Sequence, residues 1–184
     1  MKEEEMLRAD ARRNRERILA AAENVFLERG AGAALEEVAK RAGVGIGTLY
    51  RRFPTREMLL AATWNARLLS FAQETRERDA LSNPLNAMRA FLEKLVLNTQ
   101  IYQGLATSLG TVLQSGTPGC RAVSEEGIKL LLCGQQAGAI RSDITFDDIV
   151  FVTIAISLAT EQDSAPERRI AHLVDLFLHG ISAL

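Results

Sequence analysis

Apolar residues recur three or four positions apart through most of this chain, a spacing that places them on one face of a helix. Ile18, Ala22, Val25 and Phe26 begin the pattern, which continues almost to the last residue. Only four prolines occur in 184 residues, so long helices can run without interruption. Alanine and leucine are abundant while aromatic residues make up 5% of the chain, which favours helices over strands. The sequence predicts an all-α fold of about nine helices.

Residues that start and stop helices divide the chain into elements. Gly30 is expected to end a first helix that begins near residue 14, after a charged, frayed arm at residues 1–13. Pro54 disfavours helical geometry at the residue before it, so a short third helix ends there and Thr55 caps a long fourth one. Thr145 and Asp148 form a capping box. The expected helices are about 14–29, 34–42, 46–52, 55–80, 84–102, 104–114, 121–139, 146–160 and 166–184, with 116–119 as a loop and 140–144 as a connector or short strand.

Charge is distributed unevenly along the chain. Residues 11–56 hold ten Lys and Arg against five acidic residues, a surplus of +5. Residues 57–184 hold ten basic and fourteen acidic residues, a net charge of -4, although the whole chain has only -1. A basic module followed by an acidic one indicates that the N-terminal part meets a polyanion. We therefore expect two domains, at residues 1–54 and 55–184.

The segment "GVGIGTLYRRF" (residues 43–53) combines three glycines with a basic, aromatic sequence. A dinucleotide-binding fingerprint requires G-x-G-x-x-G after a strand, but the third glycine position is Thr48 and the preceding segment is predicted to be helical. The phosphate-binding string G-x-x-x-x-G-K-[ST] does not occur. Spacing and context therefore argue against a nucleotide cofactor at this segment.

A helix-turn-helix at about residues 34–53 explains the segment better, because two short helices are separated by a glycine-containing turn. Gly43 allows the tight turn. Gly45 and Gly47 carry no side chain, so the start of the third helix can approach a phosphate with its backbone N–H groups. Leu49 and Phe53 are expected to hold this helix against the first one. Three side chains are then left for the DNA groove and its rim: Tyr50, Arg51 and Arg52.

Residues 16–62 resemble the N-terminal domain of TetR-type transcriptional regulators. The matching motifs are "R-I-L", "A-x-x-x-F", "V-A-x-x-A-G-V", "G-T-L-Y-x-x-F" and "T-R-E-x-L", spread over 47 consecutive residues. The resemblance implies DNA binding by a three-helix domain, followed by a C-terminal helical bundle for ligand sensing and dimerisation.

The family pattern also implies roles for single residues. Thr48 and Tyr50 would touch phosphates, Arg51 and Arg52 would contact base edges or phosphates, and Arg56 would hold a phosphate. Two positions depart from the pattern. Ala33 stands where members commonly cap the second helix with Thr or Ser, and Gly45 stands where Ser often opens the third helix. Because both changes remove a hydroxyl, arginines of the N-terminal arm are expected to supply affinity: Arg12, Arg13 and Arg15.

The C-terminal half is similar to the family only in "LLLCGQQAGAIRSDIT" (residues 130–145), which identifies no ligand. Several apolar residues lie on inward stripes of four or five helices, where they either line an effector pocket or only pack together. The candidates are Trp64, Leu68, Phe91, Leu95, Leu109, Leu113 and Leu131. Asn98 and Gln135 would be the polar contacts of a ligand.

The last two helices carry more apolar surface than one chain can bury. "DDIVFVTIAISLAT" is apolar on nearly every side, and "RIAHLVDLFLHGISAL" has a broad apolar face. A helix that is apolar all round needs partners on both flanks. We expect a homodimer through residues about 146–182, which would also place two recognition helices on a palindrome.

Other chemistry receives little support. His172 and His179 share a helix face, but seven residues of helix separate them by about 10 Å, too far to chelate one ion. Cys120 and Cys133 form no C-x-x-C motif, and no nucleophile with a neighbouring base is apparent, so we expect no enzyme, cofactor or metal. The first residues contain no apolar signal-peptide core, and the longest apolar run, residues 149–159, is too short to span a bilayer. A cytoplasmic location is expected.

The sequence therefore predicts a dimeric repressor that binds a double-stranded DNA operator and responds to a small molecule. Two alternatives remain open at this point: a helical protein that only binds a small molecule, and a transcriptional activator.

Overall fold

The computed structural model describes residues 2–79 and 83–182, and these residues form nine α-helices and one short 3-10 helix. Within them the only strand-like pairing is an isolated bridge between Ile140 and Ser182. The all-α prediction is therefore confirmed. The elements are α1 (Lys2–Arg29), α2 (Leu35–Ala42), α3 (Ile46–Arg52), α4 (Arg56–Asp79), α5 (Pro84–Thr99), η1 (Leu105–Ser108), α6 (Leu109–Leu113), α7 (Pro118–Gln136), α8 (Phe146–Thr160) and α9 (Pro166–Ile181).

Capping residues begin several helices where the sequence indicated. The Thr55 hydroxyl accepts a hydrogen bond from the amide of Met58 at 3.2 Å, at the start of α4. At α8, the Thr145 hydroxyl accepts from the amide of Asp148, whose carboxylate in turn accepts from the Thr145 amide at 2.8 Å. These bonds satisfy amide groups that have no partner inside the helix.

Besides the ends of α5 and α7, which lie three residues earlier than expected, three predictions about the elements are wrong. Residues 2–13 are the first turns of α1 and not an irregular arm. They are rich in helix formers, and side-chain pairs one turn apart, such as Arg13 with Asp10 at 3.7 Å, support the helix. The second error concerns 116–119, because α7 begins at Pro118 with the Thr117 hydroxyl as its cap. Thirdly, 104–114 is divided into η1 and α6.

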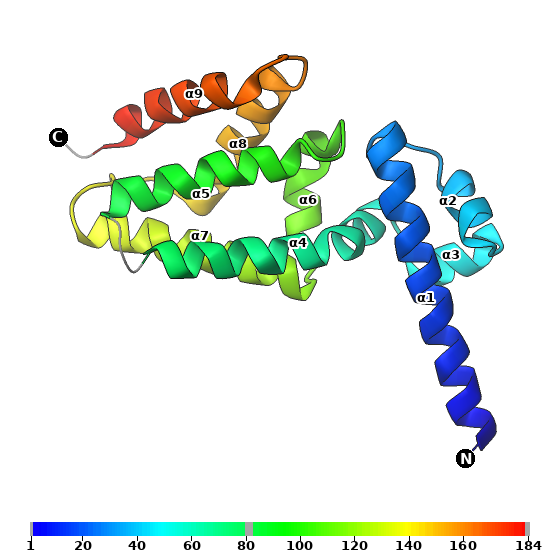
Figure 1. The fold of residues 1–184 in the computed structure, drawn as a ribbon. Helices are drawn as coiled ribbons and strands as arrows, with labels where there is room; N and C mark the ends of the chain where they lie inside the picture. Colours follow the sequence, from blue (N-terminus) through cyan, green and yellow to red (C-terminus); the bar gives the residue numbers. More distant parts are fainter. Residues whose placement is uncertain (1, 80–82, 183–184) are drawn as a thin grey trace.

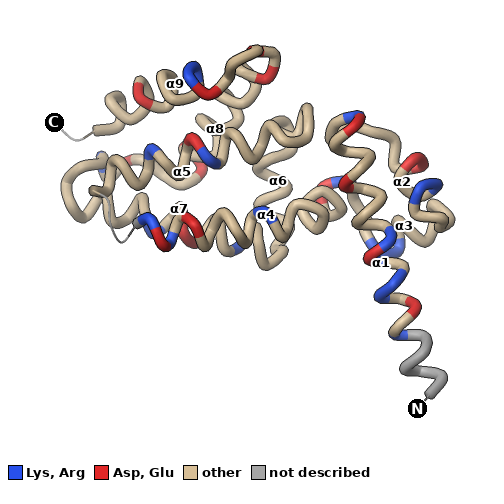
Figure 2. The backbone as a smooth tube through the Cα atoms, in the orientation of Figure 1, with Lys and Arg blue, Asp and Glu red and all other residues tan. Residues whose placement is uncertain are grey.

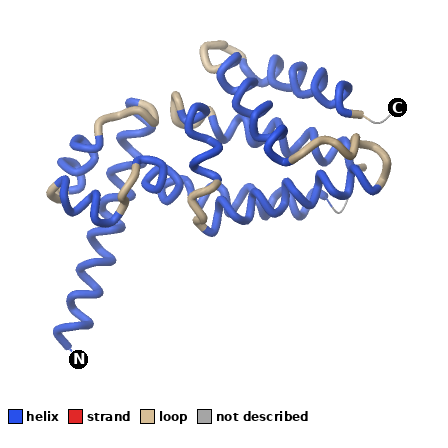
Figure 3. The backbone as a smooth tube through the Cα atoms, turned by 180° about the vertical axis from the view of Figure 1, so that it is seen from behind, coloured by secondary structure: helices blue, strands red, loops and turns tan. Residues whose placement is uncertain are grey.

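The helices form a small N-terminal domain and a larger bundle, which α4 connects (Figure 1). Helices α1 to α3 pack together at one end. In the bundle α4 lies along α7, while α5 packs against α7, α8 and α9. The view from behind shows the same order, with helices joined by short loops (Figure 3). The pair α8 and α9 therefore lies at the edge of the bundle.

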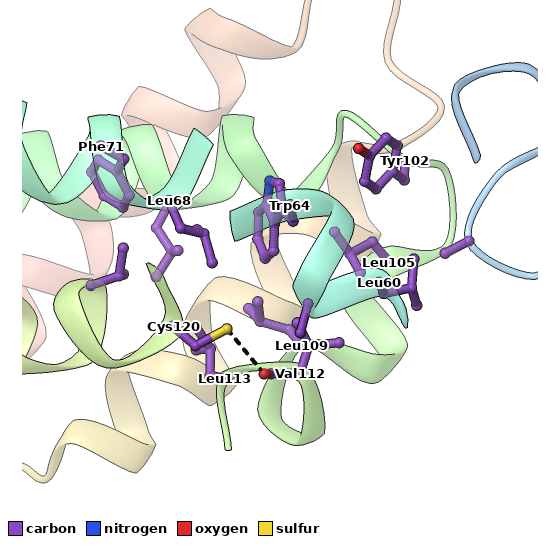
Figure 4. Packing of buried hydrophobic residues seen from close by; sticks show 14 of the residues in the cluster. Leu60, Trp64, Leu68, Phe71, Tyr102, Leu105, Leu109, Val112, Leu113 and Cys120 are labelled. Atoms are coloured by element: carbon purple, nitrogen blue, oxygen red, sulfur yellow. Dashed lines mark hydrogen bonds between the residues drawn. The ribbon is translucent and has the colours of Figure 1, made fainter. Parts of the chain in front are cut away.

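A single cluster of buried apolar side chains extends from α1 to α9 and crosses the predicted domain boundary at residues 54 and 55. Leu60, Trp64 and Leu68 project from α4 toward η1, α6 and α7 (Figure 4). Phe71 of α4 stacks on Phe91 of α5 with ring centroids 5.3 Å apart. The long helix α4 thus contributes to the core of the bundle along much of its length.

Candidate DNA-binding surface and effector region

The turn between α2 and α3 is short because Gly43 adopts the left-handed conformation, with φ 63° and ψ 38°. Its amide and that of Val44 donate to carbonyl groups in the last turn of α2, the latter to Ala39 at 3.0 Å. The Arg17 guanidinium of α1 donates to the Gly43 carbonyl at 3.4 Å and so ties the turn to the first helix. The expected helix-turn-helix geometry is present.

Helix α3 has a buried face and an exposed face. Leu49 is fully buried and Phe53 is 4% exposed, so these two side chains hold α3 against the domain as expected. On the other side, Tyr50 is 45% exposed and both arginines that follow it are exposed. The Thr48 hydroxyl accepts a hydrogen bond from Arg51 Nη2 at 3.1 Å. The exposed face therefore presents an aromatic ring, a hydroxyl and two positive charges side by side.

The glycines at the start of α3, its N-cap Gly45 and Gly47, are not required by the internal packing of the domain. A Cβ added at Gly45 or Gly47 would meet no atom within 4 Å, and both residues are exposed. Gly45 has φ -69°, a value open to any residue. The bare backbone at the start of α3 thus leaves room for a molecule outside the chain to come close.

Basic residues of α1 continue this surface. Arg15 lies over the ring of Phe53, with its guanidinium carbon 5.8 Å from the ring centroid, so the structure brings it to the end of α3. The side chains of Arg12 and Arg13 are 80% and 72% exposed. Figure 2 shows Lys and Arg along the projecting part of α1 and near α3. The contact between Arg15 and Phe53 could not be predicted from the sequence, because the two residues are far apart in the chain.

Part of the Arg56 guanidinium group makes hydrogen bonds inside the protein. Its Nη1 group donates to the carbonyl oxygens of Ala31 at 2.9 Å and Ala33 at 2.5 Å, which fixes the loop between α1 and α2. This loop contains Ala34, the N-cap of α2, whose side chain makes no capping hydrogen bond. The Nε and Nη2 groups of Arg56 remain to meet a phosphate, and that role stays a prediction.

Another arginine of the N-terminal domain, Arg41, forms ion pairs with two glutamates. Arg41 of α2 bonds to Glu28 of α1 at 2.7 Å and to Glu37 at 3.0 Å. The hydrogen bonds from Arg41 lower the pKa of both carboxyl groups. Arg41 is therefore less available to an outside partner than the exposed arginines of α3.

The predicted effector residues are packed in the bundle core. Seven apolar candidates and Asn98 are at most 7% exposed: Trp64, Leu68, Phe91, Leu95, Leu109, Leu113 and Leu131. The Asn98 amide donates to the Lys94 carbonyl of its own helix at 2.8 Å. Gln135 does not join the others, since its amide donates to the carbonyls of Arg141 and Ile144 and holds the loop before α8.

Two cavities border this core. One of about 10 Å³ is lined by Phe91 together with Thr75 and Leu130, and it is too small for more than a water molecule. The other, of about 140 Å³, lies between α6, α7 and α8 and includes Leu113 and Phe146 in its lining. The indole N–H of Trp64 is buried without a hydrogen-bond partner among the described residues. Phe146 could not be identified from the sequence, because its position depends on how α8 packs.

A metal site and a membrane-spanning helix each place requirements on the described part of the chain. No group of three or more His, Cys, Asp or Glu there has the geometry to hold a metal ion. Cys120 is buried and its thiol donates to the Val112 carbonyl at 3.2 Å. Over residues 2–79 and 83–182, none of the helices is both long and apolar enough to cross a membrane.

A helix-turn-helix with an exposed basic face thus precedes a helical bundle in this chain. The family model for bacterial regulatory proteins of the tetR family matches residues 18–63. The model described as "Transcriptional regulator SbtR-like, C-terminal domain" matches residues 83–183, more than half of the chain. The chain belongs to the TetR family. It is thus a DNA-binding transcriptional regulator, and the resemblance inferred from residues 16–62 is confirmed.

Solved TetR-family structures agree with this assignment. The regulator SCO0520 from Streptomyces coelicolor is 33% identical, with 92% of this chain and 98% of that one covered and a TM-score of 0.56. RolR in complex with resorcinol is 20% identical, with 95% and 90% covered and a TM-score of 0.69. FadR from Bacillus subtilis in complex with stearoyl-CoA is 18% identical, with 90% and 98% covered and a TM-score of 0.62. The last two show a shared fold. A search of curated proteins found no match.

Proposed function

We propose that this TetR-family regulator is a homodimeric repressor that binds a palindromic operator and leaves it when a small molecule enters the bundle. The proposal depends above all on the exposed face of α3, where Tyr50, Arg51 and Arg52 lie opposite the buried Leu49. A recognition helix needs this division, because one face must be fixed to the domain while the other enters the major groove.

The backbone contacts of the proposed complex follow from the start of α3. Gly45 and Gly47 leave the N–H groups there accessible, and Thr48 and Tyr50 can donate to the same phosphates. Arg13 and Arg15 of α1, with Arg56 at the start of α4, add positive charge around the helix-turn-helix. These contacts position the domain, whereas Arg51 and Arg52 are the candidates for reading base edges.

Dimerisation is supported by an apolar surface on α8 and α9. Phe151 is 68% exposed and Leu158 is 46% exposed, seven residues apart on one side of α8, with the exposed Ala155 between them. On α9, Leu176 is 56% exposed. Pairing α8 and α9 with the same helices of a second copy would cover these side chains in a four-helix interface.

Effector binding is supported by the unpartnered donor in the core. A buried N–H without an acceptor is costly, and a ligand carrying an acceptor oxygen would satisfy that of Trp64. Two structures with the same fold hold ligands, namely resorcinol and stearoyl-CoA. The bundle of this chain is closely packed, so ligand entry requires side chains around the 140 Å³ cavity to move.

Release from DNA would follow from a shift in the separation of the two recognition helices. Because α4 begins beside the helix-turn-helix and continues into the bundle core, a ligand that displaces it changes the position of the N-terminal domain. The ligand favours the conformation of the dimer that fits DNA badly.

The operator can be found by selecting duplexes from a random-sequence pool with the full-length chain. We expect enrichment of an inverted repeat, and failure to enrich any sequence would reject the proposal in favour of a protein that binds only small molecules. Arg51→Ala should weaken binding and relax specificity at one position of each half-site, whereas Arg121→Ala, an exposed change in the bundle, should leave both unchanged.

Repression and effector release need two further measurements. The selected operator, placed over a promoter in a reporter strain, should lower transcription when the regulator is present, and a rise would indicate an activator. A panel including resorcinol and stearoyl-CoA should contain a molecule that binds the free protein more tightly than the operator complex. Calorimetry showing equal affinity for both forms would eliminate the release mechanism.

The interface can be tested with two matched substitutions of exposed apolar residues. Phe151→Asp on α8 should give a monomer in sedimentation and lower operator affinity, because two half-sites can no longer be bound together. Leu132→Asp on α7, which replaces a side chain that is 50% exposed, should leave the dimer intact. An unchanged dimer in the first variant would contradict the proposed interface.

A further inference from the structure

The turn of residues 100–104, between α5 and η1, is bonded to the end of α8. The Gln100 side-chain amide donates to the Thr160 hydroxyl at 2.6 Å and to the Ser157 carbonyl at 3.3 Å. The backbone amide of Gly104 donates to the carboxylate of Glu161 at 2.6 Å. These bonds fix the 100–104 turn to the helix that carries the exposed apolar surface.

The same turn is bonded to the N-terminal domain. The Tyr102 hydroxyl donates to Oε2 of Glu23 in α1 at 2.9 Å, and the Tyr102 ring lies 5.8 Å from that of Phe26. The next residue, Gln103, accepts the backbone amide hydrogen of Ala31 at 2.8 Å. The turn therefore holds α1 through the side chain of Tyr102 and the loop between α1 and α2 through the main chain of Gln103.

Glu23 of α1 contacts both the 100–104 turn and α4, the helix that links the two domains covalently. Its other oxygen, Oε1, accepts a hydrogen bond from Arg67 of α4 at 3.2 Å. One carboxylate of α1 is thus shared between α4, the helix that links the two domains, and Tyr102. If α4 moves relative to the turn, one of the two hydrogen bonds to Glu23 must lengthen or break.

The contact between Tyr102 and Glu23 has the properties of a stiff connection. Tyr102 is fully buried, and a hydrogen bond to a charged acceptor is stronger than one between neutral groups. Burial, followed by the hydrogen bond to Glu23, raises the pKa of the phenol, which therefore stays protonated and donates at neutral pH. The main chain of the loop between α1 and α2 can approach that of the 100–104 turn closely because residue 30 is glycine, with φ 79°.

We propose that the 100–104 turn is a second coupling element beside α4, in which Tyr102 transmits the position of α8 to α1. Tyr102 acts as a positioning residue and touches no DNA. It sets the angle of the N-terminal domain relative to the dimer helices. The inference rests on the proposed function, because this angle matters for DNA only if two recognition helices must match the spacing of one operator.

Amide hydrogen exchange on the full-length protein tests the coupling without DNA. Glu161→Ala removes the bond from the end of α8 to Gly104. We expect it to accelerate exchange of the Ala31 amide about fivefold, because the acceptor of that amide belongs to the same turn. In a Tyr102→Phe background the further effect of Glu161→Ala should become smaller, since the side-chain contact that orders the turn against α1 is already lost while the contact of the Gln103 carbonyl remains.

Two results would overturn the proposal. The first is faster exchange at Gly104 in Glu161→Ala with no change at Ala31. The second is an undiminished effect of Glu161→Ala when Tyr102 is Phe. Thr99→Val is the matched control, because it removes a buried hydroxyl whose hydrogen bond, 2.8 Å to the Leu95 carbonyl, stays within α5. It should leave Ala31 exchange unchanged.

A second measurement uses the selected operator and two versions with one base pair added or removed at its centre. The wild-type protein should discriminate among the spacings, and Tyr102→Phe should reduce the discrimination about fivefold, whereas Thr99→Val should not. Unchanged discrimination in Tyr102→Phe contradicts the coupling. If no operator is selected, the proposed function fails, while the exchange experiment still decides whether the turn couples α8 to α1.

Discussion

The contact between the α1–α2 loop and the 100–104 turn leads to a quantitative prediction about two glycines. Gly30 and Gly138 have similar positive φ values, 79° and 65°. A Cβ added at Gly30 would lie 2.7 Å from the carbonyl oxygen of Gln103, whereas one added at Gly138 would meet nothing within 4 Å. Alanine at Gly138 therefore measures only the cost of the left-handed backbone conformation, whereas alanine at Gly30 adds the cost of the steric clash with Gln103.

The magnitudes follow from these distances. A left-handed conformation costs a non-glycine residue about 1–2 kcal/mol, which applies to both variants. Gly30→Ala must also move a backbone carbonyl, an overpacking cost of about 1–3 kcal/mol. We therefore expect Gly138→Ala to lower the free energy of unfolding by about 1–2 kcal/mol and Gly30→Ala to lower it by about 2–5 kcal/mol.

Urea unfolding followed by circular dichroism measures both losses, at one protein concentration because a dimer's stability depends on it. Equal losses in the two variants would refute the reasoning, since they would mean that the N-terminal domain and the turn separate at no cost. In Gly30→Ala the Ala31 amide should also lose protection from exchange, because its acceptor has been displaced.

Three further predictions concern DNA affinity and helix stability. Arg13→Ala should weaken binding about equally on all DNA sequences and reduce the slope of log affinity against log salt concentration by about one. The control variant Arg121→Ala should leave this slope unchanged. An unaltered slope in Arg13→Ala would exclude a phosphate contact. Thr145→Ala should lower the free energy of unfolding by about 1 kcal/mol through loss of a helix cap, measured by urea unfolding. Hydrogen bonds from Thr145 depress the pKa of Asp148, so their stabilisation of the folded state is present above the ordinary carboxyl pKa and is lost as the pH falls through the depressed value. The stability of the variant should therefore approach that of the wild type in acid. A difference in stability that stays constant with pH would contradict the assignment. Leu49→Ala, at a fully buried position under α3, should cost about 2–5 kcal/mol and abolish operator binding, as thermal unfolding and a binding assay would show.

Local signals explain why much of the fold could be predicted. The ends of α3 follow from the glycines before it and Pro54 after it, and the start of α8 follows from the capping box of Thr145 and Asp148. The inward faces of the helices follow from their apolar period, which correctly predicted that Leu49 and Phe53 are buried. These features depend on residues close together in the sequence.

Contacts between distant segments could not be predicted in this way. The sequence predicts a phosphate contact for Arg56 and a ligand contact for Gln135, but it does not indicate that Arg56 bonds to the loop before α2 or that Gln135 holds the loop before α8. The helical periodicity of the apolar residues predicts which side chains point inward, but it does not predict where cavities remain between them. For this reason the candidate effector residues could be named as buried, while the cavity beside Leu113 and Phe146 could not.

The continuity of α1 limits how this regulator can change through insertions and deletions. Its basic residues 12, 13 and 15 and the buried Ile18, the first buried side chain among those described from residue 8 onward, belong to one unbroken helix. Each residue turns such a helix by about 100°, so one residue gained or lost between Arg15 and Ile18 would swing the upstream arginines to another side of the molecule. Related genes should therefore vary freely in length before residue 12 but hardly between Arg15 and Ile18, because even seven added residues, which restore the phase, would move the arginines by about 10 Å along the axis.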